Sequence, residues 1–452
     1  MNRFSNTFLR EVLQDKGYIR GPFGSALLRS ELTSKGIPVY EQQHAIRGIR
    51  EFRFFIGDAK YIELKRFSTS PGDLIISCSG TVGEISMITK DDPLGIISQA
   101  LLILRTDPEV MLPEFLRYYL ITRQGKHAIT TASHGSVQLN IAPRKIVENI
   151  ELPLPTIIEQ KAISNILVTL DRKIEFNKKT NKNLEEIAKA LFKSWFIDFD
   201  PVKAKSEGLS TGLPDEISQL FPDSFEDSEL GKIPMSWLVR NLGECSLEIE
   251  SGRRPKGGIN KELDDGIPSV GAESIDSAGL FDFSKTKFVT NDFASSSKKG
   301  WVKNLDVALY KDGGKPGEFK PRVAIYGENY PFNSFMVNEH VFLIRSKEIG
   351  QPFLYYLLKS NLVKEQIIQK GSSKAAQPGL NQEEVKSSIF PKSNKILIEK
   401  FNKISSPIIK KQLTLGKQNI YLENLRNAIL PKLISGQLRI IDAEKIIEES
   451  VI

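Results

Sequence analysis

The stretch Leu152-Pro153-Leu154-Pro155 opens a long run of helical periodicity that ends near Trp195. A second run of this kind opens at Ile389-Phe390-Pro391 and ends near Leu433. Each run follows a segment in which short apolar stretches alternate with turns rich in glycine and proline. The chain is therefore interpreted as one unit written twice, which predicts a pseudo-symmetric molecule with two globular units and two long helices.

Short segments return in the same order in both halves, which supports the duplication. They are Gly36-Ile37-Pro38 with Gly266-Ile267-Pro268, residues 71–77 loosely with 304–310, residues 115–120 with 353–358, and Leu139-Asn140 with Leu380-Asn381. Within the first half, the apolar runs at 73–77 and 100–104 predict buried strands. Residues 114–121 are expected to form a helix with aromatic residues on its inner face.

Length and composition bound the possible classes of protein. The 452 residues suffice for two or three domains, and a hydrophobic content of 40% indicates a folded chain. The formal net charge of +7 permits nucleic-acid binding without proving it. An apolar stretch of about 18 residues is absent, so no membrane span is predicted, and the polar start favours a cytoplasmic protein. Cys78 and Cys245 fall in different halves and are expected to be buried thiols that cannot build a zinc site.

Each long run carries a heptad seam, whose positions recur at alternating steps of three and four. The first seam comprises Ile163, Leu167, Leu170, Ile174, Asn177, Asn181, Leu184, Ala188, Leu191 and Trp195. The aligned positions of the second run are Phe401, Ser405, Ile408, Gln412, Leu415, Asn419, Leu422, Arg426, Ile429 and Leu433. Such a stripe packs either against the globular unit that precedes it or against the other long helix. The absence of another obvious partner favours the helix pair.

The residues that catalysis would need are missing from the sequence. A Gly-x-x-x-x-Gly-Lys-Ser/Thr loop for nucleotide phosphates, a Gly-x-Gly-x-x-Gly dinucleotide fingerprint and an Asn-Pro-Pro-Tyr tetrad for base methylation are all absent. The four histidines are scattered, which argues against a metal site or a catalytic triad. Asp198 and Asp200 are expected to end a helix. The charges of Glu159-Gln160-Lys161 and Asp171-Arg172-Lys173 are expected to form a solvated helix face.

Binding chemistry remains, in loops rich in glycine and polar residues. Glutamine can form paired hydrogen bonds with adenine, and arginine with guanine, whereas lysine and arginine also contact phosphate. The candidate DNA-binding residues of the first half are Gln42, Gln43, His44, Arg47, Arg50, Ser79, Thr81, His134, Ser136 and Gln138. Those of the second half are Arg253, Arg254, Lys256, Lys311, Lys315, Lys320, Arg322, Lys374 and Gln377. For any single residue a solvated loop side chain is the alternative, and the set carries more weight than its members.

Several motifs resemble those of the specificity subunits of type I restriction–modification systems. The matching segments are, in chain order, 21–25, 79–83, 152–155, 159–163, 170–174, 228–234 and 430–436. The first two resemble motifs of the first target-recognition domain, and the next three resemble the central conserved segment of the family. The last two resemble the entry to the second domain and the end of the second helix. In the second half, Lys311-Asp312-Gly313-Gly314-Lys315 replaces the Ser-Gly-Thr-Val-Gly loop, so contact residues are not carried over there.

The resemblance implies an α+β fold, with two pseudo-symmetric α/β target-recognition domains separated by a pair of long antiparallel coiled-coil helices. The corresponding division is a first target-recognition domain at 1–152, a first long spacer helix at 153–199, a connector at 200–233, a second target-recognition domain at 234–392, a second long spacer helix at 393–436 and a C-terminal tail at 437–452. Each domain is then expected to read one half of a gapped, asymmetric site in double-stranded DNA.

The resemblance also implies partners. Two DNA methyltransferase subunits are expected to dock on the helices, and two motor–nuclease restriction subunits to join the complex. S-adenosylmethionine, ATP and magnesium are expected on these partners and no cofactor on this chain, which is then a non-catalytic specificity subunit. Two alternatives stay open: a coiled-coil scaffold that binds only protein, and a DNA methyltransferase or nuclease with an unrecognised site.

The two seams also predict a helix register. If the helices run antiparallel about a pseudo-twofold axis, Asn177 falls opposite Asn419, and Asn181 falls opposite Leu415. A facing asparagine pair in an apolar seam can fix alignment at some cost in stability. Asn177 and Asn419 are therefore predicted to lock the register of the helices.

Overall fold

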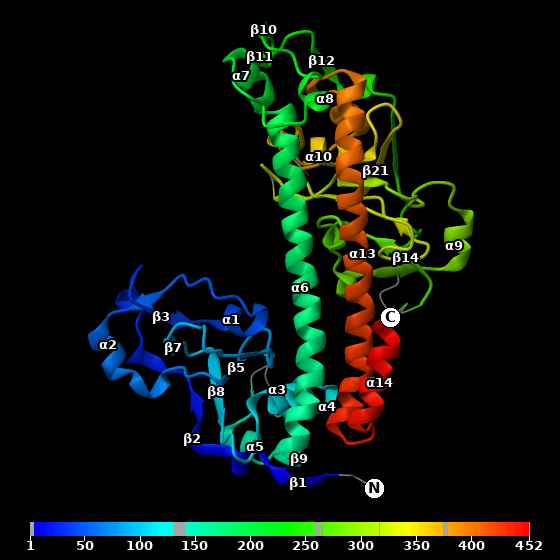
Figure 1. The fold of residues 1–452 in the computed structure, drawn as a ribbon. Helices are drawn as coiled ribbons and strands as arrows, with labels where there is room; N and C mark the ends of the chain where they lie inside the picture. Colours follow the sequence, from blue (N-terminus) through cyan, green and yellow to red (C-terminus); the bar gives the residue numbers. More distant parts are fainter. Residues whose placement is uncertain are drawn as a thin grey trace. The chain divides into compact units, whose positions relative to one another are not determined.

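The computed structural model describes residues 4–130, 141–258, 263, 265–315, 317–373 and 378–451. The chain divides into two compact units, Met1–Arg172 with Leu422–Ile452, and Lys173–Tyr421. Each unit contains one globular domain, a segment of helix α6 (Ile157–Phe196) and a segment of helix α13 (Lys395–Ile434), which Figure 1 shows in green and orange. The unit boundary therefore crosses both long helices. The division predicted from the sequence instead treated each helix as a segment separate from the domains. Among the described residues, no helix is both long and apolar enough to cross a membrane.

The first domain is built on small sheets flanked by short helices. Its main sheet has the order β2 (Leu13–Arg20), β8 (Leu101–Thr106), β5 (Leu74–Ser77) and β6 (Ile85–Met87), with antiparallel neighbours. A second sheet has the order β4 (Phe55–Ile56), β3 (Ile37–Tyr40) and β7 (Ile96–Ile97), in which β3 and β7 are parallel. β1 (Ser5–Phe8) pairs with β9 (Glu151–Leu154). The short helices are α1 (Gln42–Arg47), α2 (Asp58–Glu63), α3 (Pro113–Ile121), α4 (Arg123–Thr130) and α5 (Arg144–Glu148).

The second domain repeats this arrangement strand for strand. Its main sheet has the order β13 (Leu247–Ser251), β21 (Val341–Ser346), β16 (Val307–Tyr310) and β19 (Val323–Ile325). Its second sheet has the order β15 (Lys287–Val289), β14 (Ile267–Val270) and β20 (Met336–Val337), and β12 (Leu238–Asn241) pairs with β22 (Ile389–Lys392). As in the first domain, one pair of the second sheet, β14 with β20, is parallel. The duplication predicted from the sequence is therefore confirmed at the level of topology.

The second domain adds one hairpin to the shared pattern. Strands β17 (Gly314–Lys315) and β18 (Glu318–Phe319) lie between β16 and β19 in the chain. The hairpin occupies the position of the short loop between β5 and β6 in the first domain. The short helices of the second domain are α9 (Asn291–Ser296), α10 (Gln351–Lys359), α11 (Asn361–Ser372) and α12 (Gln382–Lys386). The added hairpin explains why the motif at 79–83 has no counterpart in the sequence of the second half.

The buried elements expected from apolar patterning are present. Every residue of β5 is buried, and β8 and its counterpart β21 are buried along most of their length. The expected aromatic helix is α3, whose residues Phe115, Tyr118 and Tyr119 are buried. Strands that are mostly apolar and buried suit a sheet that is covered on both faces.

The two long helices begin at polar caps. The carboxylate of Glu159 accepts a hydrogen bond from the backbone N–H of Thr156 at 3.1 Å, and the side chain of Asn394 accepts one from the N–H of Leu397 at 2.9 Å. These contacts satisfy N–H groups that the first helical turn leaves without an intrahelical partner. After α13, Gly436 adopts a φ of 73°, a left-handed conformation that commonly ends a helix.

The segment 200–233 is folded rather than extended. It forms α7 (Asp200–Ser206), α8 (Asp215–Ser218) and a hairpin of β10 (Phe225–Ser228) with β11 (Gly231–Pro234). Val202 and Phe221 are buried in the same apolar cluster as Trp195 and Trp237. This connector therefore belongs to the core of the second unit. The tail at 437–452 is largely helix α14 (Ile440–Val451).

Candidate nucleic-acid interface

The first domain has an open hollow where α1 meets the loops after β5 and β7. Its lining comprises Glu41, Gln42, Gln43, Ile46, Arg47, Arg53, Thr81, Ser98 and Ala100. The amide Nε2 of Gln42 donates to Oγ of Ser79 at 3.2 Å, which ties α1 to the loop 79–83. An adjoining hollow shares Glu41 and Ser98 and adds Gln99. The structure therefore brings Gln42, Gln43, Arg47, Ser79 and Thr81 together, as a shared recognition surface requires.

The arginines around this hollow differ in whether they form an ion pair inside the domain. Glu41 binds Arg53, with Nη2 of the arginine 2.7 Å from Oε1 of the carboxylate. Arg47 is exposed and has no hydrogen bond or ion pair with any residue that the structure describes. Its guanidinium is therefore available to an external partner, and Gln43 beside it offers an amide. An amide and a guanidinium are groups that can form paired hydrogen bonds with base edges in the major groove.

His44 is a structural residue, and its assignment as a DNA-binding residue was wrong. Its side chain is fully buried, and its ring stacks on Phe52 with 4.6 Å between the ring centroids. Nε2 lies 3.0 Å from the carbonyl oxygen of Glu51 and must donate to it, since a carbonyl only accepts. Nδ1 then accepts from the backbone N–H of Glu41 at 2.7 Å. Both ring nitrogens are occupied inside the domain, so neither is left for a nucleic acid.

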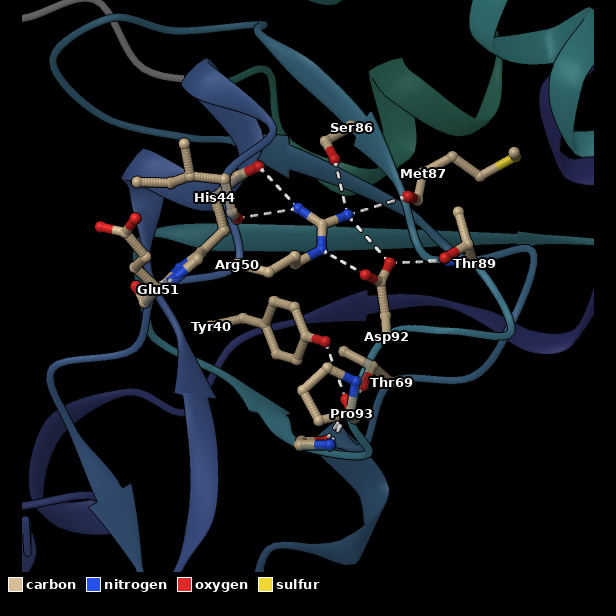
Figure 2. Close-up of polar contacts among 12 residues, drawn as sticks. Tyr40, His44, Arg50, Glu51, Thr69, Ser86, Met87, Thr89, Asp92 and Pro93 are labelled. Carbon is tan, nitrogen blue, oxygen red and sulfur yellow. Dashed lines mark hydrogen bonds and ion pairs between the residues drawn. The ribbon is translucent and has the colours of Figure 1, made fainter. Parts of the chain in front are cut away.

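Arg50 is likewise an internal clamp, which corrects the second assignment on this segment. Figure 2 shows its guanidinium enclosed by Asp92, Ser86 and the carbonyl oxygens of neighbouring loops. Nε and Nη2 donate to the two carboxylate oxygens of Asp92 at 2.8 and 3.0 Å. Nη2 also donates to Ser86 and Met87, and Nη1 to the carbonyl oxygens of Ile49 and His44. With its donors used in this way, Arg50 cannot read a base.

The electrostatics around Arg50 agree with this structural role. Burial alone would raise the pKa of Asp92, but hydrogen bonds from Arg50 and from the backbone N–H of Thr89 hold that pKa below its usual value. Burial raises the pKa of Tyr40, which packs beside the clamp, to about 12. The clamp therefore joins the loop after α1 to the segment before β7 through an ionised pair.

Some sequence candidates fall outside the described residues. These are His134, Ser136 and Gln138 of the first domain and Lys374 and Gln377 of the second. Lys315 lies on β17, but its side chain is outside the described part.

The candidates of the second domain are mostly exposed and several are paired. Arg253, Lys256 and Arg322 are exposed. Nε of Arg254 lies 3.7 Å from Oε1 of Glu339, and Nζ of Lys320 lies 2.5 Å from Oε1 of Glu318. Lys311 forms an ion pair with Asp312. The second domain thus presents a surface of cations with carboxylate partners, unlike the amide-lined hollow of the first.

Backbone hydrogen bonds align the recognition loops of the two domains residue by residue. The N–H of Ser98 donates to the carbonyl of Tyr40 at 2.8 Å, and the N–H of Asn338 donates to that of Val270 at 3.0 Å. The N–H of Cys78 donates to the carbonyl of Ala100 at 2.9 Å, and the N–H of Lys311 donates to that of His340 at 3.0 Å. The bonds from Ser98 and Asn338 join the two parallel strands of their domains. The bonds from Cys78 and Lys311 join two strands of the main sheet.

This alignment identifies candidate residues that sequence reasoning missed. They are Ser98 and Gln99 in the first domain and Glu273, Asp312, Glu339 and His340 in the second. A usable signal existed, because the loop of equal length before β8 and β21 is bounded by matching apolar runs in both halves.

The comparisons with known proteins agree with this duplicated recognition fold. Residues 20–186 match the family model described as the type I restriction modification DNA specificity domain. The chain is 28% identical over 365 residues to the MjaIX specificity subunit of Methanocaldococcus jannaschii, a match covering 78% of this chain and 77% of that protein. It is 25% identical over 425 residues to the HindI specificity subunit of Haemophilus influenzae, covering 84% and 86%. The chain is therefore similar to type I specificity subunits over most of its length.

The fold agrees with a solved member of the family. The S subunit of the type I restriction–modification system of M. genitalium aligns with a TM-score of 0.55 at 17% identity, over 96% of each chain. The resemblance stated from the motifs and the predicted α+β fold class are therefore confirmed.

The two long helices of this chain contact each other at the predicted asparagines. Nδ2 of Asn177 donates to Oδ1 of Asn419 at 3.0 Å, and both side chains are buried. Asn181 meets Gln412 rather than the expected Leu415, and its Nδ2 donates to the backbone oxygen of Gln412 at 3.1 Å. Higher numbers on α6 contact lower numbers on α13, so the two segments run antiparallel within the second unit. That the asparagine pair fixes the register stays a prediction.

Two polar residues of α6 make internal contacts, although this segment was expected to be a solvated face. Gln160 is fully buried, and its Oε1 accepts from the N–H of Leu112 at 2.8 Å. Asp171 accepts from the hydroxyl of Tyr118 on α3 and from Nη1 of Arg426 on α13, each at 2.7 Å. These side chains fasten the first domain and the end of α13 to α6 inside the first unit.

The second unit uses a different polar junction. Glu185 of α6 accepts from the hydroxyl of Tyr355 on α10 at 2.9 Å and from Nε2 of Gln412 at 3.1 Å, and it forms an ion pair with Lys359. Each domain is thus fixed to both helices of its own unit through a carboxylate of α6.

The expected burial of the two cysteines is confirmed, because Cys78 and Cys245 are both buried free thiols. Burial raises the pKa of the Cys245 thiol to about 11, which makes it a poor nucleophile. Among the described residues, no group of three or more histidine, cysteine or acidic side chains could hold a metal ion.

Proposed function

We propose that this chain reads a bipartite, gapped site in double-stranded DNA, with one half-site bound by each domain. The observation that carries the proposal is a repeated set of loops, here called the recognition edge. It comprises the loops after β3, β5 and β7 in the first domain and after β14, β16 and β20 in the second. The backbone of this edge is repeated, but it presents different polar side chains in the two domains. A reader of one symmetric site would need the same side chains twice. Two different sets at equivalent positions suit two different half-sites.

The chain acts as the non-catalytic member of its complex. Two DNA methyltransferase subunits and two motor–nuclease restriction subunits are the partners, and S-adenosylmethionine, ATP and magnesium bind to them. Support comes from the missing nucleotide and methylation motifs of the sequence and from relatives named as specificity subunits of type I restriction enzymes.

Two experiments test the proposal. Methylome sequencing of the host with and without this gene should show one gapped motif that disappears with the gene. Replacing residues 1–150 with the matching domain of a relative should then change one half of that motif only. A change in both halves, or in neither, would contradict the two-domain division.

The absence of catalysis is tested separately with the purified chain. It should transfer no methyl group when given S-adenosylmethionine and cut no DNA when given ATP and magnesium, whereas addition of the partner subunits should restore both reactions. Turnover by the isolated chain would favour the enzyme alternative.

A further inference from the structure

The recognition edge of the second domain carries acidic groups where the first carries amides and small residues. The backbone alignment pairs Gln43 with Glu273, Ser79 with Asp312, Gln99 with Glu339 and Ala100 with His340. These positions lie on the segments that follow β3 and β14, β5 and β16, and β7 and β20. The exchange is therefore confined to the loops that form the hollow in the first domain.

The side chains of this edge converge on His340. Nδ1 of His340 lies 3.1 Å from Oδ2 of Asp312, and Nε2 lies 3.4 Å from Oε1 of Glu339. The side chains of His340, Asp312 and Glu339 are 41%, 22% and 28% exposed, so a ligand at the surface can reach them. The group is held in place but not enclosed.

The two carboxylates keep unused acceptor capacity. Lys311 and His340 both contact Oδ2 of Asp312, while Oδ1 accepts no hydrogen bond from the residues that the structure describes. Neither oxygen of Glu339 accepts a hydrogen bond from the described residues. A buried structural pair such as Arg50 with Asp92 uses both carboxylate oxygens, so Asp312 and Glu339 differ from it in the feature that recognition needs.

Paired cations make this acidic edge compatible with DNA. Lys287 lies 2.6 Å from Glu273, Lys311 pairs with Asp312, and Arg254 lies 3.7 Å from Glu339. Each carboxylate therefore has a cation beside it, which offsets repulsion from the phosphates. An ionised carboxylate acts as an acceptor only.

We propose that Asp312 and Glu339 determine the specificity of the second domain by accepting hydrogen bonds from the exocyclic amino group of a base in the major groove. Cytosine N4 and adenine N6 are the groups that donate there, and carboxylates are suited to accept from them. The inference rests on the proposed function and adds the residues and the base group that make the contact. The amides and hydroxyls of the first domain can both donate and accept, so that domain is not restricted in this way.

The test uses the full chain in complex with its methyltransferase partner and duplexes that contain the motif found by methylome sequencing. Each cytosine or adenine of the second half-site is replaced in turn by 2-pyrimidinone or purine, which lack the amino group. One replacement should weaken binding of the unmodified complex by roughly 5- to 140-fold, the range expected for a specific base contact. Whether that position holds cytosine or adenine identifies the amino group.

The matched variants are Asp312→Ala and Glu339→Ala, which remove the accepting oxygens. At least one of them should lose most of the discrimination at the same position while the first half-site stays unchanged. Glu244→Ala is the control, because Glu244 is an exposed carboxylate of the same domain whose Oε2 lies 2.8 Å from Nη1 of Arg240. It should bind all duplexes like the unmodified chain.

Two results would overturn the inference in different ways. If both alanine variants discriminate like the unmodified chain, or weaken binding to all duplexes equally, Asp312 and Glu339 do not read a base, and the proposed function stands. If no methylated motif depends on this gene, the proposed function fails and the inference fails with it.

Discussion

The two domains share their internal framework and differ at their recognition edge. In the first, Nε of Arg105 on β8 lies 2.7 Å from the buried Asp73. In the second, Nε of Arg345 on β21 lies 2.5 Å from the buried Asp306. At the edge, by contrast, Ser79 corresponds to Asp312. The comparison shows that a repeated backbone can be kept by repeated buried contacts while the exposed loops change their chemistry.

The shared ion pair has the same electrostatic signature in both domains. The hydrogen bond to Asp73 raises the pKa of Arg105 although burial opposes it, and the hydrogen bond to Asp306 does the same for Arg345. Both arginines therefore remain charged and depend on their carboxylates. Removal of either carboxylate is therefore expected to destabilise its domain more than the other substitutions considered below.

The largest effect is expected from removal of the buried aspartates. Asp73→Ala or Asp306→Ala should lower the free energy of unfolding of its own domain by about 3–5 kcal/mol, because the first leaves Arg105 without an ion-pair partner and the second leaves Arg345 with Glu250 alone. Hydrogen exchange of the main-sheet amides measures each domain separately, which a single melting curve of a two-unit chain does not.

The control for this prediction is Glu186→Ala, which removes an exposed helical pair with Lys189. It should change stability by less than about 0.5 kcal/mol. A loss below 1 kcal/mol in either aspartate variant would show that the two domains do not rely on the same contact.

The next effect separates two neighbouring arginines of the first domain. Arg50→Ala should destabilise that domain by roughly 3 kcal/mol, since it strands Asp92, whose side chain is 9% exposed. Arg47→Ala should leave stability unchanged and weaken DNA binding by the complex, because Arg47 has no partner among the described residues. Chemical unfolding and DNA titration of both variants give the comparison. If Arg50→Ala instead weakened DNA binding without loss of stability, Arg50 would be a DNA-binding residue after all.

A smaller effect is expected at the helix pair of the second unit. Asn177→Leu and Asn419→Leu should each cost about 1–3 kcal/mol, because each leaves a buried amide without its partner. The double variant should cost less than the sum of the two, as residues in direct contact couple. A double-mutant cycle by urea unfolding measures this. Additive losses would mean that the hydrogen bond does not link the helices.

The smallest effect concerns phosphate contacts of the second domain. Arg253→Ala should reduce the slope of log affinity against log salt concentration by about 0.9, the value for one released counterion. Lys320→Ala should change the slope less, because Lys320 is paired with Glu318. Binding titrations over a range of salt concentrations provide the measurement. An unchanged slope for Arg253→Ala would mean that Arg253 is a solvated side chain that does not contact phosphate.

Periodic features of the fold were predictable from the sequence. The seams of α6 and α13 and the apolar runs of β5 and β8 are set by local spacing, which needs no knowledge of distant residues. The duplication was visible for the same reason, because corresponding strands keep their apolar pattern. The order of strands in each sheet and the folding of the connector depended on contacts that no local pattern contains.

The candidate site was predictable only where exposure follows from the loop itself. Gln43 and Arg47 were named as candidates because they lie in a polar segment that follows a strand. Arg50 was misassigned because its partner, Asp92, is distant in sequence and no spacing rule links them. Asp312 and Glu339 were missed because carboxylates alone look unfavourable for DNA, and the cations that compensate them come from other segments.

The most direct test of the central claim transfers the recognition edge of the second domain to the first. The variant carries Gln43→Glu, Ser79→Asp, Gln99→Glu and Ala100→His, and the methylome of a host expressing it is sequenced. We expect a motif whose first half is altered and whose second half and gap are unchanged, because the second domain serves as the internal control. An unaltered first half, or any change in the second half, would contradict the claim that each domain reads its own half-site through this edge.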